Sequence, residues 1–314
     1  MTITWNDIFT QGTLIDYSVH MWRARIQLTA SDLGIEQTDD VVQALSFGCH
    51  RLAPAKSFEQ INICVRLWQK AIEEHSLNFP LLNGVRYVPD NQVAQLQAKL
   101  ERQEREFSAC VREFIEEYGD IQDEMIPVLK SALHSACKNE EAADVAIERV
   151  VNEYPSSQRI ASKFGLEWNF FTISLPTSQD AVKTAKSAVP QVQKVIESMV
   201  TELRTELAEK VETLLKLSAK AKAGQSRAKN GFGQKSVESA LAVLDKVERL
   251  NILNDPAITQ QTNILRSLLD SEADAFQISQ ELDSVKTSLK KDITDAAQDA
   301  EKRLTGMGNR KLTT

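Results

Sequence analysis

Apolar residues recur at helical spacing along most of the chain, which predicts a mainly α protein. Residues 57–75 place their apolar side chains on one face of a helix. After Asp90, a repeat with alternating steps of three and four comprises Val93, Leu96, Leu100, Gln103, Phe107, Cys110 and Phe114, and it is apolar except at Gln103. This heptad spacing is typical of a long helix that packs along a partner helix.

Two short stretches interrupt the helical pattern. Residues 84–88, "GVRYV", and residues 169–174, "NFFTIS", are rich in β-branched and aromatic side chains and lack a helical period. A lone strand leaves its backbone donors and acceptors unpaired. We therefore predict that 84–88 pairs with 169–174 to form a small two-stranded β clasp that packs on the helices.

The helical pattern changes its character near residue 176. Residues 177–223 contain no aromatic side chain, and the helices predicted beyond residue 176 carry narrow apolar stripes with charged flanks. The first stripe comprises Val192, Ile196, Met199, Leu203, Leu207, Val211 and Leu214, and the last comprises Ile278, Leu282, Val285, Leu289, Ile293, Ala296, Ala300 and Leu304. Narrow stripes on long helices favour an extended hairpin or bundle over a wide globular core.

These patterns together predict two domains. Residues 1–176 form a mixed helical core with the β clasp, and residues 177–314 form an elongated, coiled-coil-like arm that folds back on itself as a hairpin. The narrow stripes leave little apolar surface for a core within one chain. This shortage favours further packing of the protein into oligomers through the arm.

A Gly-rich basic loop is predicted at residues 224–233, "GQSRAKNGFG". Between Glu212 and Glu238 the chain carries basic residues and no acidic one. The candidate partner-binding residues there are Lys220, Lys222, Arg227, Lys229, Phe232 and Lys235. Positive charge attracts an acidic partner, and the Phe232 ring is of a type that stacks on nucleic-acid bases. The alternative is a solvated helix end, where lysines interact favourably with the helix dipole.

The sequence contains no recognisable motif for catalysis or metal binding. A P-loop requires a lysine directly after its second glycine, whereas Gln234 separates Gly233 from Lys235. The histidines are scattered, and the acidic run 116–124 has neither a histidine partner nor EF-hand spacing. We therefore expect a protein that is not an enzyme and that has no catalytic residues, no cofactor and no metal site.

Composition and charge are those of an ordinary globular protein, with 42% hydrophobic and 26% charged residues. The net charge of -7 argues against wholesale binding to nucleic acid or to an anionic membrane, although it is compatible with a local basic patch. No stretch reaches the ~18 consecutive apolar residues of a membrane span. The N-terminus lacks the pattern of a signal peptide, and the cysteines form no CxxC pair. We expect a cytoplasmic protein that does not bind membranes.

Several segments match a known family in order along the chain. They are "WRARIQLTASDLGI" (22–35), "FGCHRLAP" (47–54), "LLNGVRYVP" (81–89), "FSACVREFIEEYGD" (107–120) and "SSQRIASKFGLEWNFFTISLP" (156–176). Over roughly residues 13–176 the chain resembles the domain of unknown function numbered 3150, a family of uncharacterised proteins of phages, plasmids and bacterial mobile elements. The arm resembles this family only in being helical.

The resemblance implies a partner rather than a reaction. Genes of this family often lie beside those of a MoxR-type AAA+ ATPase and of a protein with a von Willebrand factor A domain. The resemblance therefore implies an adaptor that works with such an ATPase, and it supplies no catalytic residues. The alternative is a nucleic-acid-binding accessory protein that uses the basic loop.

Overall fold

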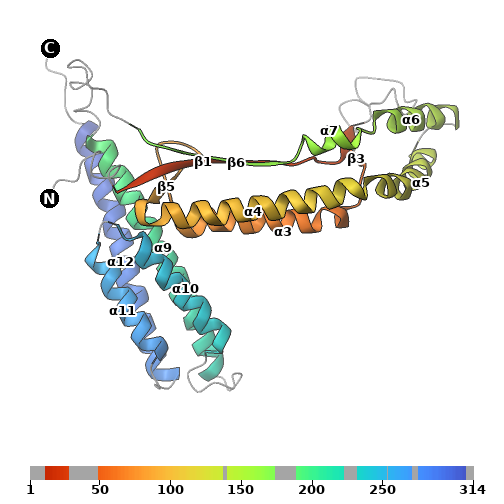
Figure 1. Cartoon of the computed structure of the whole chain (residues 1–314). Coiled ribbons are helices and arrows are strands. Elements are labelled where there is room, and N and C mark those ends of the chain that lie inside the picture. Colours follow the sequence, from red (N-terminus) through yellow and green to blue (C-terminus); the bar gives the residue numbers. More distant parts are fainter. Residues whose placement is uncertain are drawn as a thin grey trace, which may run out of the picture. The chain divides into compact units, whose positions relative to one another are not determined.

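The fold is mainly helical, with a small antiparallel sheet (Figure 1). A computed structural model describes residues 11–27, 49–136, 140–173, 189–222, 232–252, 254–270 and 275–308. The fold class predicted from the apolar periodicity is confirmed. Among the described residues, no helix is both long enough and apolar enough to cross a lipid bilayer.

The strands are short, and most lie in the first third of the chain. They are β1 (Gly12–His20), β2 (Arg25–Gln27), β3 (Cys49–Arg51), β4 (Leu77–Asn78), β5 (Arg86–Pro89) and β6 (Gly165–Phe171). The helices of the described residues are longer. After a 3-10 turn at Ala55–Phe58 they are α3 (Glu59–His75), α4 (Asp90–Glu116), α5 (Tyr118–Ala136), α6 (Glu140–Glu153), α7 (Ser157–Ala161), α9 (Val189–Lys222), α10 (Gln234–Leu250), α11 (Pro256–Asp270) and α12 (Ala275–Gly308).

The chain forms two compact units, and each is assembled from separate stretches of sequence. Unit 1 contains Met1–Asp16, Ile72–Gln97 and Asn169–Thr314, and unit 2 contains Tyr17–Ala71 and Ala98–Trp168. The unit boundaries fall inside β1, α3, α4 and β6, so each of these elements contributes residues to both units. The domain boundary predicted near residue 176 lies outside the described residues.

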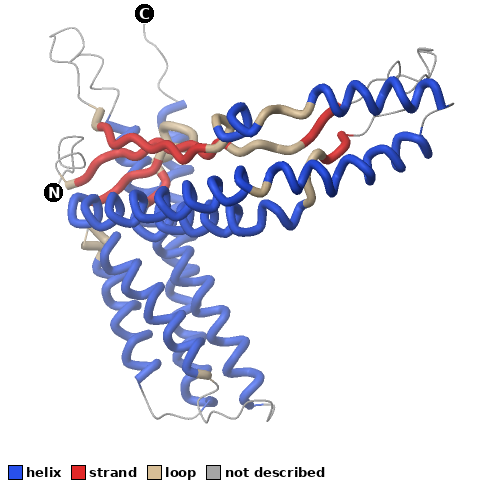
Figure 2. Tube along the Cα trace, turned by 45° about the vertical axis from the view of Figure 1, so that its right-hand side comes forward, coloured by secondary structure: helices blue, strands red, loops and turns tan. Residues whose placement is uncertain are grey.

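The larger sheet has four strands in the order β4-β5-β1-β6. β1 pairs with β5 in antiparallel register, with Gly12 opposite Pro89 and Leu14 opposite Tyr87, and β4 pairs with the other edge of β5. β6 lies on the other side of β1, and the two long strands run side by side in Figure 2. The Thr13 hydroxyl donates a hydrogen bond to the Phe171 carbonyl oxygen at 2.8 Å.

The predicted β clasp is wrong, because the strands β5 and β6 do not pair with each other. β1 lies between them and satisfies one edge of each. β1 was not predicted as a strand, so the two predicted segments had only each other as partners. Its pattern is nevertheless strand-like, since β-branched or aromatic residues occupy alternate positions, namely Thr13, Ile15, Tyr17 and Val19.

Unit 1 gains its core where the sheet packs against the arm. Buried side chains of the sheet, Leu14, Leu77 and Tyr87, join the same hydrophobic cluster as the arm helices. The arm contributes Val195, Met199, Leu203, Leu207, Val211 and Leu214 from α9, and Ile278, Leu282, Val285 and Leu289 from α12. Most described members of the two predicted stripes are therefore buried.

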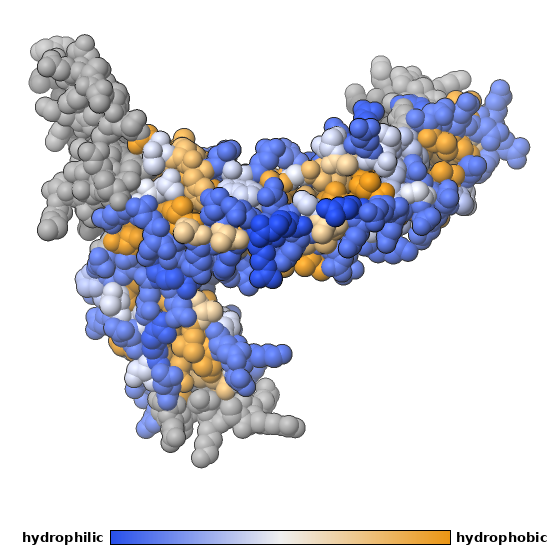
Figure 3. All heavy atoms as spheres, in the orientation of Figure 1, coloured by the Kyte–Doolittle hydropathy of each residue, from blue (hydrophilic) through white to orange (hydrophobic). Residues whose placement is uncertain are grey.

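The arm helices form a bundle that shares its core with the sheet. α9 packs along α12, and α10 packs against both α9 and α11. α10 and α11 add buried residues such as Leu244, Val247, Ile258 and Leu265, so the apolar stripes of α9 and α12 are covered within one chain. Figure 3 shows polar side chains over most of the visible face of these helices, with a hydrophobic strip between them.

Glu202 of α9 binds the edge of the sheet within unit 1. Its carboxylate accepts a hydrogen bond from the Asn78 backbone N–H at 2.7 Å and pairs with the Arg86 guanidinium at 3.2 Å. Arg86 also donates to the Ser76 hydroxyl at 2.7 Å. The edge strand β4 therefore has one of its backbone donors satisfied by a helix side chain, which protects it from pairing with another chain.

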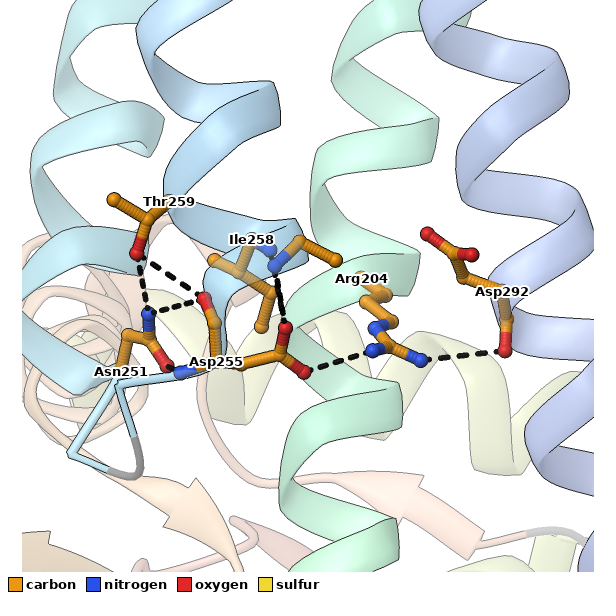
Figure 4. A network of polar contacts seen from close by, with 7 residues as sticks. Arg204, Asn251, Asp255, Ile258, Thr259 and Asp292 are labelled. Carbon is orange, nitrogen blue, oxygen red and sulfur yellow. Dashed lines mark hydrogen bonds and ion pairs between the residues drawn. The ribbon is translucent and has the colours of Figure 1, made fainter.

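Asp255 joins three helices of the arm (Figure 4). One carboxylate oxygen accepts hydrogen bonds from the backbone N–H groups of Ala257 and Ile258, which caps α11. The other oxygen lies 2.8 Å from the Arg204 guanidinium of α9, and Arg204 also donates to the Asp292 carbonyl oxygen of α12 at 3.2 Å. The side chains of Arg204 and Asp255 are 16% and 12% exposed, so the pair is largely removed from water.

Gly12 is required by the close approach of β1 to β5. A Cβ atom at this position would lie 2.5 Å from the Tyr87 ring and 2.5 Å from the Val88 carbonyl oxygen. We predict that Gly12→Ala lowers the free energy of unfolding by about 1–3 kcal/mol, because the strands must separate to admit the methyl group. The measurement is urea denaturation followed by intrinsic fluorescence.

The control for this prediction is Gly119→Ala in α5, where no atom lies within 4 Å of the added methyl group. Alanine is a better helix former than glycine, so this change is expected to raise the free energy of unfolding by up to about 1 kcal/mol. Equal effects of the two substitutions would contradict the steric argument.

Removal of Asp255 is expected to leave an uncompensated charge in the arm. We predict that Asp255→Ala lowers the free energy of unfolding by about 3 kcal/mol, because Arg204 then remains buried without its partner. The double variant Arg204→Met/Asp255→Ala is expected to lose less unfolding free energy than Asp255→Ala alone, since no buried charge is left without a partner.

The control is Arg102→Ala, which removes an ion pair whose side chains are 72% and 41% exposed. It is expected to lower the free energy of unfolding by at most about 0.5 kcal/mol. Equal losses for Asp255→Ala and Arg102→Ala would show that the Asp255 pair is not buried in solution.

Candidate functional site

A cleft in unit 2 is built around the turn that follows β1. Residues 21–24 lead from β1 to β2, and Ala24 adopts a φ of 49°, in the left-handed region that side chains other than glycine rarely occupy. This conformation costs on the order of 1–2 kcal/mol. Ala24 is buried, and its carbonyl oxygen accepts a hydrogen bond from the Leu52 backbone N–H at 2.8 Å, which holds the turn in place. Strained backbone residues that are held by their surroundings cluster at functional sites.

Trp22 precedes this turn, and its ring is fixed by aromatic neighbours. The ring centroid lies 6.1 Å from that of Phe58, 6.1 Å from that of Phe114 and 5.8 Å from that of Tyr118. The Tyr118 hydroxyl donates to the Pro155 carbonyl oxygen at 3.1 Å, and burial raises the pKa of this phenol well above its usual range. The cluster therefore joins the turn after β1, the 3-10 turn, α4 and α5 to the segment before α7 through aromatic contacts and one hydrogen bond.

Tyr154 closes the other side of the cleft. Its hydroxyl donates to the Leu52 carbonyl oxygen at 3.2 Å, and burial raises its pKa to about 12. Leu52 itself is buried with Leu129, Leu133, Ala146 and Val150 in the core between α5 and α6, against which Trp22 and Tyr154 pack. The rings that line the cleft are thus supported by a hydrophobic core.

Two adjoining cavities form the cleft, and they share Trp22 and Arg25 among their lining residues. The first, of about 470 Å³, is lined by Met21, Trp22, Arg23, Ala24, Arg25, Ala53, Ala55, Phe58 and Asn62. The second, of about 560 Å³, is lined by Trp22, Arg25, Leu52, Asn152, Tyr154, Pro155, Ser156, Arg159, Ile160 and Lys163. Among the residues that the structure describes, neither lining contains a carboxylate.

Every charged side chain that lines the cleft in the described part of the chain is positive. Arg23, Arg25, Arg159 and Lys163 are all exposed, and none of these side chains forms an ion pair within the described part of the chain. Arg159 follows the Ser156 N-cap, whose hydroxyl accepts a hydrogen bond from the Arg159 backbone N–H at 3.3 Å. Unpaired cations beside fixed aromatic rings suit an anionic ligand with a flat, apolar part.

The described residues offer little for other chemistry. Among them, no group of three or more His, Cys, Asp or Glu side chains is placed to hold a metal ion. Cys64 and Cys110 lie together, with their sulfur atoms 3.7 Å apart, and burial raises the pKa of the Cys64 thiol to about 11. A thiol with a raised pKa carries little thiolate at neutral pH and is a poor nucleophile.

The candidate residues predicted from the sequence lie in the arm, and the structure treats them differently. Lys220 and Lys235 are exposed, and Lys222 is the last residue of α9. Arg227 and Lys229 lie outside the described residues, as does most of the loop 224–233. Phe232 is only 5% exposed and belongs to the core of the arm. Its ring is therefore not available for stacking on a base in this structure.

The basic cleft was not predicted as a site. The run Trp22-Arg23-Ala24-Arg25 was noticed only as part of a family resemblance. A tryptophan followed by two arginines, Arg23 and Arg25, was a usable signal, but its partners Tyr154, Arg159 and Lys163 lie more than 120 residues away in the sequence. Only the tertiary fold brings these segments together.

Comparison with known proteins identifies the family. Residues 10–282 match the family described as "Protein of unknown function (DUF3150)". The match extends beyond residue 176 into the arm, further than the resemblance recognised in the sequence. No curated protein and no solved structure matches the chain. Because the family match covers most of its length, the chain belongs to the DUF3150 family.

Proposed function

We propose that the protein is a non-enzymatic adaptor whose arm presents a basic end to a protein partner. The observation that carries this proposal is the exposure of Lys220 and Lys235 in a segment that contains no acidic residue between Glu212 and Glu238. The chain as a whole has a net charge of -7, so this end of the arm differs in sign from the rest of the protein.

The packing of α9 against α10 places both lysines toward the connection between these helices. The Lys210 ammonium donates to the Ser239 hydroxyl at 2.7 Å, and Lys246 pairs with Glu206 at 2.8 Å. Contacts at 210 with 239 and at 206 with 246 describe two antiparallel helices. Residues after 210 on α9 therefore lie toward residues before 239 on α10, which is where Lys220 and Lys235 occur.

The packing of α9 against α12 supports the basic end of the arm. α9 runs antiparallel to α12, with Lys286 paired to Glu212 at 3.8 Å and Arg204 bonded to the Asp292 carbonyl oxygen. We propose that the two long helices form the coiled-coil-like spacer predicted from their stripes. A positive end on a rigid support steers an acidic surface toward it and speeds association more than it strengthens the final complex.

The proposed partner is an AAA+ ATPase of the MoxR type, together with a protein that contains a von Willebrand factor A domain. This choice of partner rests on the gene neighbourhood implied by the family resemblance. We also propose that the protein acts in the cytoplasm. A nucleic-acid-binding accessory role for the arm end is the alternative, although the burial of Phe232 removes its stacking component.

We predict that Lys220→Ser/Lys235→Ser weakens binding to a MoxR-type ATPase from the same gene neighbourhood by about 3- to 10-fold at low salt, because each exposed charge contributes only a few tenths to 1 kcal/mol. The difference is expected to shrink as salt rises and screens the charges. Biolayer interferometry over a salt series measures both effects.

Lys290→Ser/Lys291→Ser is the matched control. These residues are also exposed lysines of the arm, but α12 places them near Arg204, roughly 20 Å along α9 from Lys220 at 1.5 Å per residue. Equal losses in the two double variants would indicate a general charge effect and would reject a docking end. A loss of DNA binding by the Lys220/Lys235 variant, without a loss of ATPase binding, would favour the nucleic-acid alternative.

A further inference from the structure

We infer that the cleft around Trp22 in unit 2 binds single-stranded nucleic acid. This site is separate from the basic end of the arm, and it does not depend on the proposed ATPase partnership. Three features of the cleft support this inference. They are the sign of its charge, the distribution of that charge over two cavities, and the fixed aromatic rings among the lining residues.

The charge of the cleft matches a phosphate backbone. Arg23 and Arg25 line the first cavity, and Arg25, Arg159 and Lys163 line the second. These side chains are exposed and form no ion pair in the described ranges, so their donors are available to a ligand. Guanidinium groups bind phosphate oxygens in a bidentate manner, and two of the three lining cations in the second cavity are arginines.

The distribution of the cations fits a chain of phosphates better than a single anion. The two cavities have volumes of about 470 and 560 Å³. They share Trp22 and Arg25, so they are neighbouring parts of one cleft. Arg23 lines only the first cavity, and Arg159 and Lys163 line only the second, so each of the cavities that share Trp22 has a cation of its own. A strand that crosses the cleft therefore meets basic side chains before and after an aromatic ring, which is the arrangement of known single-strand binding grooves.

Trp22 has the properties of a stacking platform. Phe58, Phe114 and Tyr118 pack against its ring and prevent it from turning, yet the residue is only half-buried and lines both cavities. A ring that is already fixed loses little conformational entropy when a base stacks on it. Tyr154 offers a second ring in the larger cavity, and its hydroxyl is held by the Leu52 carbonyl oxygen.

Stacking favours a single strand over other polyanions. In a duplex the faces of the bases are covered by their neighbours, so the rings of the cleft cannot reach them. An acidic peptide can pair with the cations but has no flat surface for Trp22. Asn152 and Ser156 add an amide and a hydroxyl to the larger cavity, and these groups can bond to base edges.

The test measures binding of a fluorescein-labelled oligodeoxythymidine of about 12 nucleotides to the full chain by fluorescence anisotropy, over about 0.05 to 0.3 M salt. Arg159→Ser/Lys163→Ser is expected to weaken the salt dependence. The slope of log K against log salt, which is negative, becomes smaller in magnitude by about 1.4, because each lost phosphate contact contributes about 0.7 for single strands. The corresponding loss of affinity at 0.1 M salt is about 25-fold.

Arg112→Ser/Lys130→Ser is the matched control, since these residues are an exposed arginine and an exposed lysine of unit 2 that line neither cavity. This variant is expected to keep the slope and affinity of the parent protein. All four substituted positions are exposed, so thermal unfolding of both variants is expected to match that of the parent, and the comparison does not depend on a core substitution.

An abasic oligonucleotide of the same length tests the stacking component. The parent is expected to bind it at least about fivefold more weakly, because even one stacked base contributes this much. The inference is overturned if the parent shows no binding at 0.05 M salt, if the Arg159/Lys163 variant binds as the parent does, or if the abasic strand binds equally well. Tighter binding of polyglutamate than of the oligonucleotide would assign the cleft to an acidic protein and would also overturn it.

Discussion

The backbone of β1 must satisfy hydrogen-bonding groups on both of its edges, and much of the fold follows from this requirement. β5 covers one edge and β6 the other, so segments from three distant parts of the chain are brought into one sheet. Leu14 then enters the core shared with the arm, while the end of the same strand leads into Trp22 and the strained turn at Ala24. Without β1, neither the core of unit 1 nor the cleft of unit 2 would have its present residues in place.

How much of this was predictable depended on the range of the interactions. Helical periodicity is local, so the stripes of α9 and α12 could be predicted directly from the sequence. The pairing of strands is not local. Residues 84–88 and 169–174 were recognised as strand-like, but their pairing was assigned wrongly because β1 had been overlooked. The sequence around Trp22 gave a local signal, but the complete cleft could not be predicted, since Trp22 and Lys163 meet only through tertiary packing that includes α5 and α6.

The arm and the cleft use charge in opposite ways. In the arm, Arg204 is buried against Asp255, and the pair positions α9, α11 and α12. In the cleft, Arg25 and Arg159 are exposed and have no acidic partner among the described residues. Buried charges require a partner within the protein, because desolvation without one is costly. Exposed charges do not, so they remain available for a ligand. The proposed adaptor role and the inferred strand-binding role are compatible, because they use different residues in different units.

The supports of the cleft are largely main-chain atoms. Leu52 donates through its N–H to Ala24 and accepts the Tyr154 hydroxyl through its carbonyl oxygen, and Tyr118 bonds to the carbonyl oxygen of Pro155. Every residue except proline supplies the same backbone groups. Evolution can therefore replace the side chain of Leu52 without removing these hydrogen bonds, whereas Tyr118 and Tyr154 must keep their hydroxyl groups. Distant relatives that keep the two tyrosines are therefore expected to keep the outline of the cleft even where the acceptor residues at positions 24, 52 and 155 have changed.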